Sequence, residues 1–240
     1  YTVEELDPGD KWLPGAITCT IYPPAGSPRS DDASFVLAAG ERAVCAITNT
    51  RRGQIVIRKV TEPLSREEFG FSTSFGPNIS VVAGQPYYSP MLDPGVYTVT
   101  ESQPLPSGWD LVGSSCSDGS LTSAISLEAG ETITCTFTNR QRGSITVVKQ
   151  LQVGGIGLDP TTFQFSSTGG MTTTSPFDVI TDGTVGLEVF NNLPAGAYSV
   201  AEVPITGWGL VSAGYLRASS PHPAAIALGA GENITCTFVN

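Results

Sequence analysis

The feature that most constrains this chain is a strand-like segment that the sequence contains three times. It reads Ala-Val-Cys-Ala-Ile-Thr-Asn at 43–49, Ile-Thr-Cys-Thr-Phe-Thr-Asn at 133–139 and Ile-Thr-Cys-Thr-Phe-Val-Asn at 234–240. Each copy follows a Leu-x-Ala-Gly-Glu turn. A recurrence on this scale predicts an array of one small β module rather than a single enzyme-sized domain.

Two further landmarks locate the boundaries of the repeats. A Tyr-centred segment that ends in Glu recurs at 1–5, 95–101 and 196–202. An opening segment recurs at 53–59 and 143–149, with apolar residues alternating as in a half-buried strand and a Lys at its end. We therefore predict three repeats: the C-terminal part of an incomplete module at 1–52 (first repeat), and complete modules at 53–142 (second repeat) and 143–240 (third repeat).

The first repeat lacks the opening strand, and a β module without it exposes an apolar sheet face and an open edge. Two explanations are compatible with the sequence. The chain is a segment of a longer tandem protein, or a neighbouring chain supplies the missing strands. No residues follow the final strand at Asn240 that could be donated, so the first explanation is favoured.

Composition indicates an all-β protein. The chain has 27 Gly and 18 Pro, and only 14% of its residues are charged. Short runs rich in Val, Ile, Thr, Phe and Tyr between these turn residues predict an Ig-like β-sandwich in each module. In the second repeat the expected strands are 54–60, 69–74, 79–83, 97–102, 111–115, 122–127 and 132–139.

Several function classes are disfavoured. The net charge of −10 and the lack of a basic stripe argue against nucleic-acid binding, and no apolar run is long enough for membrane insertion. The sequence has one His, no calcium-loop motif, no Ser-His-Asp or Cys-His set and no phosphate-binding loop. We therefore expect no metal, no cofactor and no enzymatic turnover.

Four of the five cysteines recur at equivalent positions of the first and second repeats. Cys19 and Cys116 each lie seven residues after a Trp, whereas Cys45 and Cys135 lie in the recurring final strand. Pairing Cys19 with Cys45 and Cys116 with Cys135 is the only scheme that respects the repeat. Each such bridge contributes about 3 kcal/mol in the chain-entropy model.

The fifth cysteine, Cys236, has no equivalent partner, because Tyr215 stands seven residues after the Trp of the third repeat. The sequence therefore predicts a free thiol at Cys236. Disulfides persist in oxidising surroundings, so we expect a secreted or cell-surface protein.

Three polar residue types recur in the same order in the two complete modules: Lys, Glu and a final Asn. They are Lys59, Glu101 and Asn139 in the second repeat and Lys149, Glu202 and Asn240 in the third. If the first and last strands are neighbours, the amine can reach the carboxamide, and an apolar setting favours the neutral forms of amine and carboxylic acid. A neutral amine is a nucleophile and the acid can polarise the amide oxygen and relay protons, which predicts an intramolecular isopeptide bond.

A simpler interpretation of these residues remains open. The lysines can be solvent-facing strand residues, the glutamates their salt-bridge partners, and the asparagines turn formers before the next repeat.

These motifs resemble the prealbumin-like B-type domains of Gram-positive collagen adhesins and SpaA-like pilins. The resemblance lies in the Ile-x-Val-x-Lys opening strand, the Gly-x-Tyr-x-Val-x-Glu strand with its following Gly-aromatic turn, and the final Asn, and it extends over both complete modules. It implies rigid stalk segments, commonly locked by a Lys–Asn or Lys–Asp bond with an acid between them.

We therefore interpret the chain as part of an extracellular, pilus-like stalk or filament whose partners are neighbouring modules or copies of itself. Linkers of three residues, Thr50-Arg-Arg52 and Arg140-Gln-Arg142, favour a fixed angle between modules. The alternative is an adhesin segment that binds a surface ligand through exposed loops; the candidate is Ser166–Val189 in the third repeat, which is longer than its counterpart in the second.

Overall fold

The computed structural model describes residues 1–152, 160–215 and 222–240, and every regular element in these ranges is a β-strand. Among the described residues no helix is long and apolar enough to span a membrane. The strands are β1 (Trp12–Leu13), β2 (Ile17–Tyr22), β3 (Arg29–Asp31), β4 (Arg42–Ile47), β5 (Thr50–Arg51), β6 (Gln54–Glu62), β7 (Glu68–Thr73), β8 (Gly76–Val82), β9 (Tyr87–Tyr88), β10 (Gly95–Tyr97), β11 (Val99–Glu101), β12 (Trp109–Cys116), β13 (Ile125–Leu127), β14 (Thr132–Gln141), β15 (Gly143–Gln150), β16 (Thr162–Thr168), β17 (Phe177–Ile180), β18 (Val185–Leu193), β19 (Gly196–Glu202), β20 (Ser212–Tyr215), β21 (Ile226–Leu228) and β22 (Asn233–Val239).

The chain forms two compact units. The first comprises Tyr1–Lys59, Glu68–Gln103 and Ser114–Phe137, and the second comprises Val60–Glu67, Pro104–Gly113 and Thr138–Asn240. Their limits differ from those of the three repeats, so the division into modules at 1–52, 53–142 and 143–240 stays a prediction.

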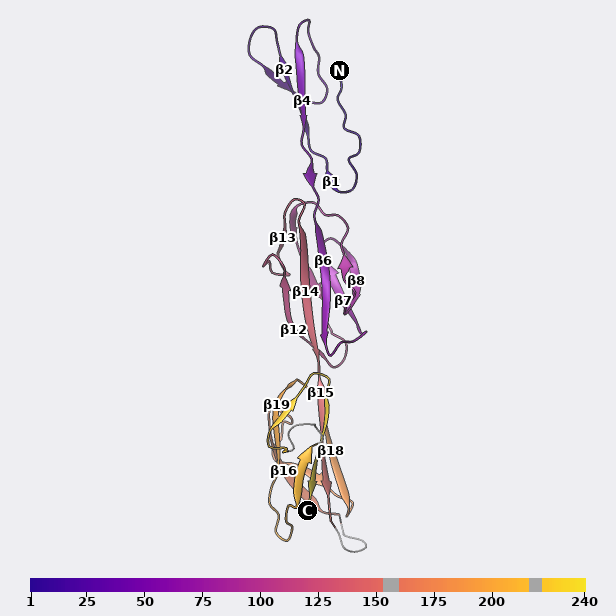
Figure 1. Cartoon of the computed structure of the whole chain (residues 1–240), viewed down its shortest axis with the longest axis vertical. Helices are drawn as coiled ribbons and strands as arrows, with labels where there is room; N and C mark the ends of the chain where they lie inside the picture. The colour runs from indigo at the N-terminus through magenta and orange to yellow at the C-terminus, as the bar shows by residue number, and fades with distance from the viewer. Residues whose placement is uncertain (153–159, 216–221) are drawn as a thin grey trace. The chain divides into compact units, whose positions relative to one another are not determined.

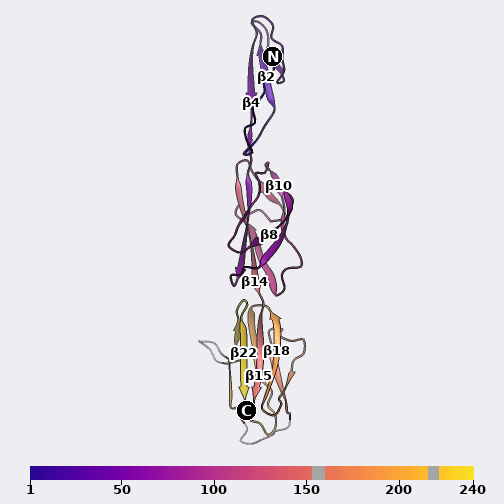
Figure 2. The same ribbon diagram turned by 90° about the vertical axis from the view of Figure 1, so that its right-hand side faces the viewer.

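The third repeat is a sandwich of two four-stranded sheets. One sheet has the order β18-β15-β22-β20 and the other β17-β16-β19-β21. Figure 2 shows β15 beside β22, and the two strands run parallel from Ser144 opposite Asn233 to Gln150 opposite Val239. Alternating residues of both sheets face a single core, which includes Ile145, Val147, Phe163, Phe165, Val200, Ile234 and Phe238.

The second repeat contains a four-stranded sheet of order β12-β14-β6-β9, and Figure 1 shows β14 beside β6. Its other strands form the sheets β11-β7-β8 and β10-β13. The all-β sandwich expected from the sequence is therefore confirmed.

Two expected strands of the second repeat differ in detail. The strand expected at 97–102 is interrupted at Thr98, whose backbone N–H donates to the side-chain Oγ of Ser74 at 2.9 Å rather than to a neighbouring strand. The chain thereby changes partner, from β13 to β7. The strand expected at 122–127 is shorter and begins only at Ile125, because Leu121 and Ala124 form a tight turn.

The first repeat contains a small sheet of order β3-β2-β4 and the two-stranded pair β1-β5. Its buried core consists of Cys19, Ile21 and Phe35. Val3 and Leu37 pack against this core but are only partly buried.

Two segments expected to be irregular lie partly in strands. The range Ser166–Val189, the loop candidate for ligand binding, holds all of β17 together with the end of β16 and the start of β18. Alternation explains this difference, because Phe177 and Val179 point into the core. Arg140 and Gln141, expected in a linker, are the last residues of β14.

Candidate functional site

Lys149 is the buried end of an otherwise apolar strand face. On β15 the residues Ile145, Val147 and Lys149 point into the core in turn, and Lys149 is 0% exposed. Its Nζ lies 4.6 Å from the centre of the Phe163 ring, a cation–π distance. The period of two along a strand therefore places an amine where a third aliphatic side chain would otherwise lie.

Glu202 faces this amine from the opposite sheet. It is the last residue of β19, and its Oε2 lies 3.2 Å from Lys149 Nζ. The Glu202 side chain is only 5% exposed, so water screens this pair weakly.

Asn240 completes the group immediately after β22. Its backbone N–H donates to the Gln150 carbonyl at 3.1 Å, and its carbonyl accepts from the Gln152 N–H at 2.6 Å, so the parallel pairing with the β15 segment continues through Asn240. Its side-chain Nδ2 donates to Glu202 Oε1 at 2.7 Å. The carboxylate of Glu202 therefore contacts the lysine with one oxygen and the asparagine with the other.

Burial changes the acid–base chemistry of the lysine. Loss of hydration lowers the pKa of Lys149 below its usual value, and the nearby Glu202 carboxylate opposes that effect only in part. Proton transfer from Lys149 to Glu202 would give a neutral amine and a carboxylic acid, and a neutral amine can attack an amide carbon.

The amide of Asn240 presents its nitrogen to the glutamate, whereas its Oδ1 is buried without a hydrogen-bond partner among the described residues. In this orientation Glu202 contacts the amide nitrogen of Asn240 and not the amide oxygen. Polarisation of the amide oxygen by the acid, the role expected from the sequence, would require the amide to rotate by about a half turn.

The second repeat reproduces the lysine–glutamate contact. Lys59 Nζ lies 3.3 Å from Glu101 Oε1 and 4.2 Å from the centre of the Phe69 ring, and it donates to the Phe137 carbonyl at 3.3 Å. Burial lowers the pKa of Lys59, again opposed by the neighbouring carboxylate. Asn139 is 0% exposed, and both of its side-chain amide atoms lack a hydrogen-bond partner among the described residues.

The first repeat contains the glutamate and asparagine of the same arrangement. Asn49 Nδ2 donates to Glu5 Oε1, and the Gly15 N–H donates to Asn49 Oδ1 at 3.3 Å. The second carboxylate oxygen, Glu5 Oε2, is buried and accepts no hydrogen bond from the described residues.

The aromatic ring over each lysine was not anticipated from the sequence. A signal for it exists, because Phe-x-Phe occurs at 69–71 and at 163–165, and each first Phe lies over a lysine. The four residues of the two pairs are 0% exposed.

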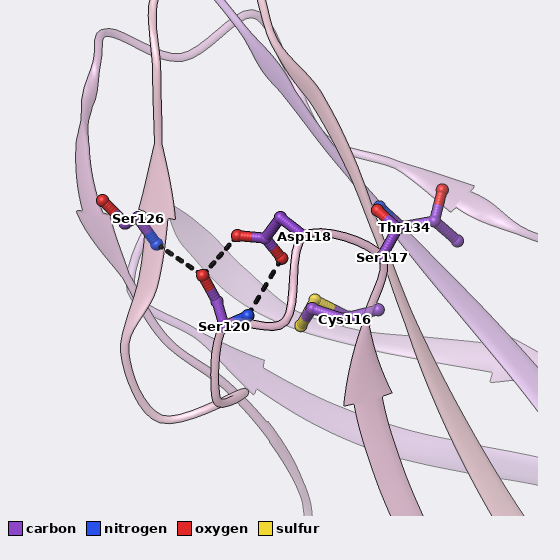
Figure 3. The surroundings of a disulfide bond; sticks show 7 residues. Cys116, Ser117, Asp118, Ser120, Ser126 and Thr134 are labelled. Atoms are coloured by element: carbon purple, nitrogen blue, oxygen red, sulfur yellow. Dashed lines mark hydrogen bonds between the residues drawn. A yellow bond between two sulfur atoms is a disulfide. The ribbon is translucent and has the colours of Figure 1, made fainter.

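The structure contains two disulfides, Cys19–Cys45 and Cys116–Cys135. Cys19 and Cys45 are direct cross-strand partners on β2 and β4. Figure 3 shows Cys116 at the end of β12, where the chain turns through Asp118 and Ser120. Asp118 accepts from the Ser120 N–H at 3.2 Å, and Ser120 Oγ accepts from the Ser126 N–H at 3.3 Å, so this turn is hydrogen-bonded on both sides.

Cys236 is a buried free cysteine, and burial raises the pKa of its thiol to about 12. It lies opposite Tyr215 in the β20–β22 pair, as Cys19 lies opposite Cys45 in the first repeat. The described residues contain no group of three or more His, Cys, Asp or Glu side chains that could hold a metal ion.

Tyr215 lies opposite Cys236 as Cys19 lies opposite Cys45, so Tyr215→Cys is expected to form a disulfide with Cys236. The variant should show no alkylatable thiol under non-reducing denaturing conditions. On reduction its intact mass should rise by about 2 Da more than that of the unmodified chain, because it holds one disulfide more. Ala213→Cys, two residues earlier on β20 and opposite Phe238, is the control and should retain two alkylatable thiols. Two free thiols in Tyr215→Cys would contradict the equivalence of the positions.

Comparison with known proteins identifies the fold of the second repeat. Residues 55–141 match the family model described as a prealbumin-like fold domain. These residues carry Lys59, Glu101 and Asn139. No protein of curated function matches the sequence.

The solved structures that match this chain include one protein of Bacillus anthracis and two streptococcal pilins. The Bacillus anthracis TIE protein is 22% identical with a TM-score of 0.34, and the match covers 83% of this chain and 37% of that one. A streptococcal ancillary pilin is 13% identical with a TM-score of 0.31, covering 96% and 93% of the two chains. The major pilin T3.2 of Streptococcus pyogenes is 12% identical with a TM-score of 0.34, covering 79% and 98%.

Proposed function

We propose, from the prealbumin-like fold of residues 55–141 and the buried Lys–Glu–Asn groups, that this chain is a structural segment of an extracellular stalk or filament. Its complete modules would be locked by isopeptide bonds from Lys59 to Asn139 and from Lys149 to Asn240, promoted by Glu101 and Glu202. The protein would act by resisting extension, with no catalytic turnover beyond the single formation of each bond.

The observation that carries this proposal is the placement of Glu202 between a buried amine and a buried amide, with contacts of 3.2 Å and 2.7 Å. A buried ion pair alone is weak evidence for stability, because the desolvation of both charges offsets their attraction. An amide bond removes both charges from the core. The group is therefore better explained by bond formation than by a permanent ion pair.

The reaction conserves atoms and electrons and needs no oxidant. Starting from the ion pair, Glu202 takes one proton from the Lys149 ammonium, and the neutral Nζ then attacks Asn240 Cγ. Glu202 then delivers a proton to Nδ2, the Cγ–Nδ2 bond breaks, and ammonia leaves. The second amine proton passes to Glu202, so the product is a Nζ–Cγ amide beside a neutral carboxylic acid, and neither charge of the ion pair remains.

The location of the cross-link suits a load-bearing role. It would join β15 to the residue that follows β22, two neighbouring parallel strands that begin and end the third repeat. A pulling force applied to the two ends of this repeat would then act on a covalent bond rather than on strand hydrogen bonds. The two disulfides are consistent with the extracellular location that this use requires.

The proposal predicts a mass deficit. After complete reduction, the intact chain should be lighter than its sequence mass by about 17 Da for each bond formed, or about 34 Da for two, because each substitution expels ammonia. Proteolysis and fragmentation should recover branched peptides that join Lys59 to Asn139 and Lys149 to Asn240. A reduced mass equal to the sequence mass would leave the lysines and glutamates as buried ion pairs and would overturn the isopeptide proposal.

A further inference from the structure

We propose that Trp208 is a positioning residue for the bond between Lys149 and Asn240. It holds the Phe163 ring over the amine and keeps water away from Glu202. This inference rests on the isopeptide chemistry proposed above, and it gives a role in that chemistry to a residue outside the Lys–Glu–Asn group. The role concerns the rate at which the bond forms.

A tight turn places Trp208 against the core of the third repeat. The Trp208 N–H donates to the Ile205 carbonyl at 3.2 Å, and Gly207 between them has a φ of +89°. Residues with a side chain rarely adopt that backbone conformation, so a glycine suits this position of the turn. Trp208 is partly buried and packs against the core that includes Phe163. The turn and the core together fix where the indole lies.

The indole contacts the ring that covers the lysine. The ring centres of Trp208 and Phe163 lie 5.5 Å apart with an angle of 74° between their planes, the edge-on packing that aromatic pairs favour. The same Phe163 ring has Lys149 Nζ 4.6 Å from its centre. Phe163 is 0% exposed, so its ring has little room to move while the indole is present. Removal of the indole would let the ring shift away from the amine.

A cavity of about 150 Å³ lies beside the carboxylate of the site. It is lined by Glu202, Pro204, Ile205, Trp208 and Leu210. Leu210 is 52% exposed, so the cavity lies close to the surface, whereas the Glu202 side chain is only 5% exposed. Loss of the indole would widen this cavity and give water a route to the carboxylate.

Water at this place would oppose the reaction. The attack requires a neutral amine, and burial is the main cause that disfavours the charged form of Lys149. Hydration stabilises the ammonium and the carboxylate, so it favours the ion pair over the neutral amine and acid. A ring packed against the amine also restricts where Nζ lies relative to Asn240 Cγ. Trp208 is therefore expected to accelerate bond formation, chiefly through Phe163.

The second repeat reproduces the turn. The Trp109 N–H donates to the Pro106 carbonyl at 3.2 Å, and Gly108 has a φ of +79°. Trp109 is 6% exposed. Each complete repeat thus has its own tryptophan and its own lysine, so a substitution in the third repeat leaves the second as an internal control.

The test follows bond formation in the whole chain as it refolds. Chain isolated in denaturant from inclusion bodies is diluted into a thiol–disulfide buffer, quenched with acid at intervals, reduced and digested. Mass spectrometry then counts the branched peptide of each repeat, with the sample taken before dilution as the starting level, and circular dichroism follows folding. Trp208→Ala should fold but should form the Lys149–Asn240 bond about tenfold more slowly than the unmodified chain. The Lys59–Asn139 bond should form at an unchanged rate.

Two further variants separate positioning from a role in packing alone. Trp208→Phe keeps an aromatic ring at the position and should restore most of the rate. Phe163→Leu removes the ring over the amine and should slow the bond to a similar degree. In the double variant of Trp208→Ala and Phe163→Leu, the loss should be smaller than the product of the two single losses, because the tryptophan acts through Phe163.

An unchanged rate of the Lys149–Asn240 bond in folded Trp208→Ala would overturn the positioning role. Fully multiplicative losses in the double variant would overturn it as well. If Trp208→Ala does not fold, Trp208→Leu, which retains apolar volume without a ring, takes its place with the same expected result. An unmodified chain that forms neither branched peptide refutes the proposed function itself, whereas equal rates with and without the indole refute only this inference.

Discussion

Glu202→Gln is expected to leave Lys149 and Asn240 unjoined, and thus to raise the reduced mass by about 16 Da, from ammonia retained and the lighter side chain. The free energy of unfolding of the third repeat should fall by at least 4 kcal/mol. The chain-entropy model assigns about 4 to 5 kcal/mol to a cross-link that closes a loop of roughly 90 residues, as Lys149 and Asn240 would. The variant also leaves a buried ammonium without a carboxylate, which adds to the loss.

The measurement combines intact mass with calorimetric unfolding of the whole chain. Glu188→Gln is the matched control, because Glu188 lies on β18 in the same repeat but is exposed. The Glu188→Gln chain should retain the mass deficit and should unfold at the same temperature as the unmodified chain. If Glu202→Gln kept the mass deficit that belongs to the Lys149–Asn240 bond, the glutamate would not be what promotes that bond.

Replacing Cys116 and Cys135 together by alanine is expected to lower the free energy of unfolding of the second repeat by about 3 kcal/mol. The disulfide closes a loop with a sequence separation of 19, and its removal enlarges the conformational freedom of the unfolded chain. Calorimetry of the double variant under non-reducing conditions measures the change.

The third repeat offers a control for the packing part of this loss. Cys236 is 0% exposed at the equivalent position of the final strand, as Cys135 is, but forms no disulfide. Cys236→Ala should therefore cost only the loss of a small buried group, about 1 kcal/mol. Equal losses in the double variant and in Cys236→Ala would assign the whole effect to packing and none to the covalent bridge.

Much of the fold could be predicted because it follows from local periodicity and repetition. The period of two along 143–149 places Lys149 in phase with Ile145 and Val147, and that phase is the one buried in the structure. The all-β class and the sandwich follow from the same alternation. The repeat also suggested the disulfides that the structure contains, since Cys19 and Cys116 share one spacing from a Trp.

Irregular positions were less predictable. The break at Thr98 depends on the hydroxyl of Ser74, more than twenty residues away, which takes the place of a strand hydrogen bond. The strand character of 166–189 was missed because its Gly, Ser and Thr content is typical of a loop, although Phe177 and Val179 supply the core contacts.

The sequence by itself determined which residue types recur, at what spacing, and on which face of each strand, because strand geometry is periodic and local. Only the tertiary structure decided that Glu202 meets Lys149 and Asn240 from the opposite sheet, that Phe163 covers the amine, and that the amide nitrogen faces the carboxylate. These contacts depend on how two sheets pack across a common core. No pattern within a single strand contains that information.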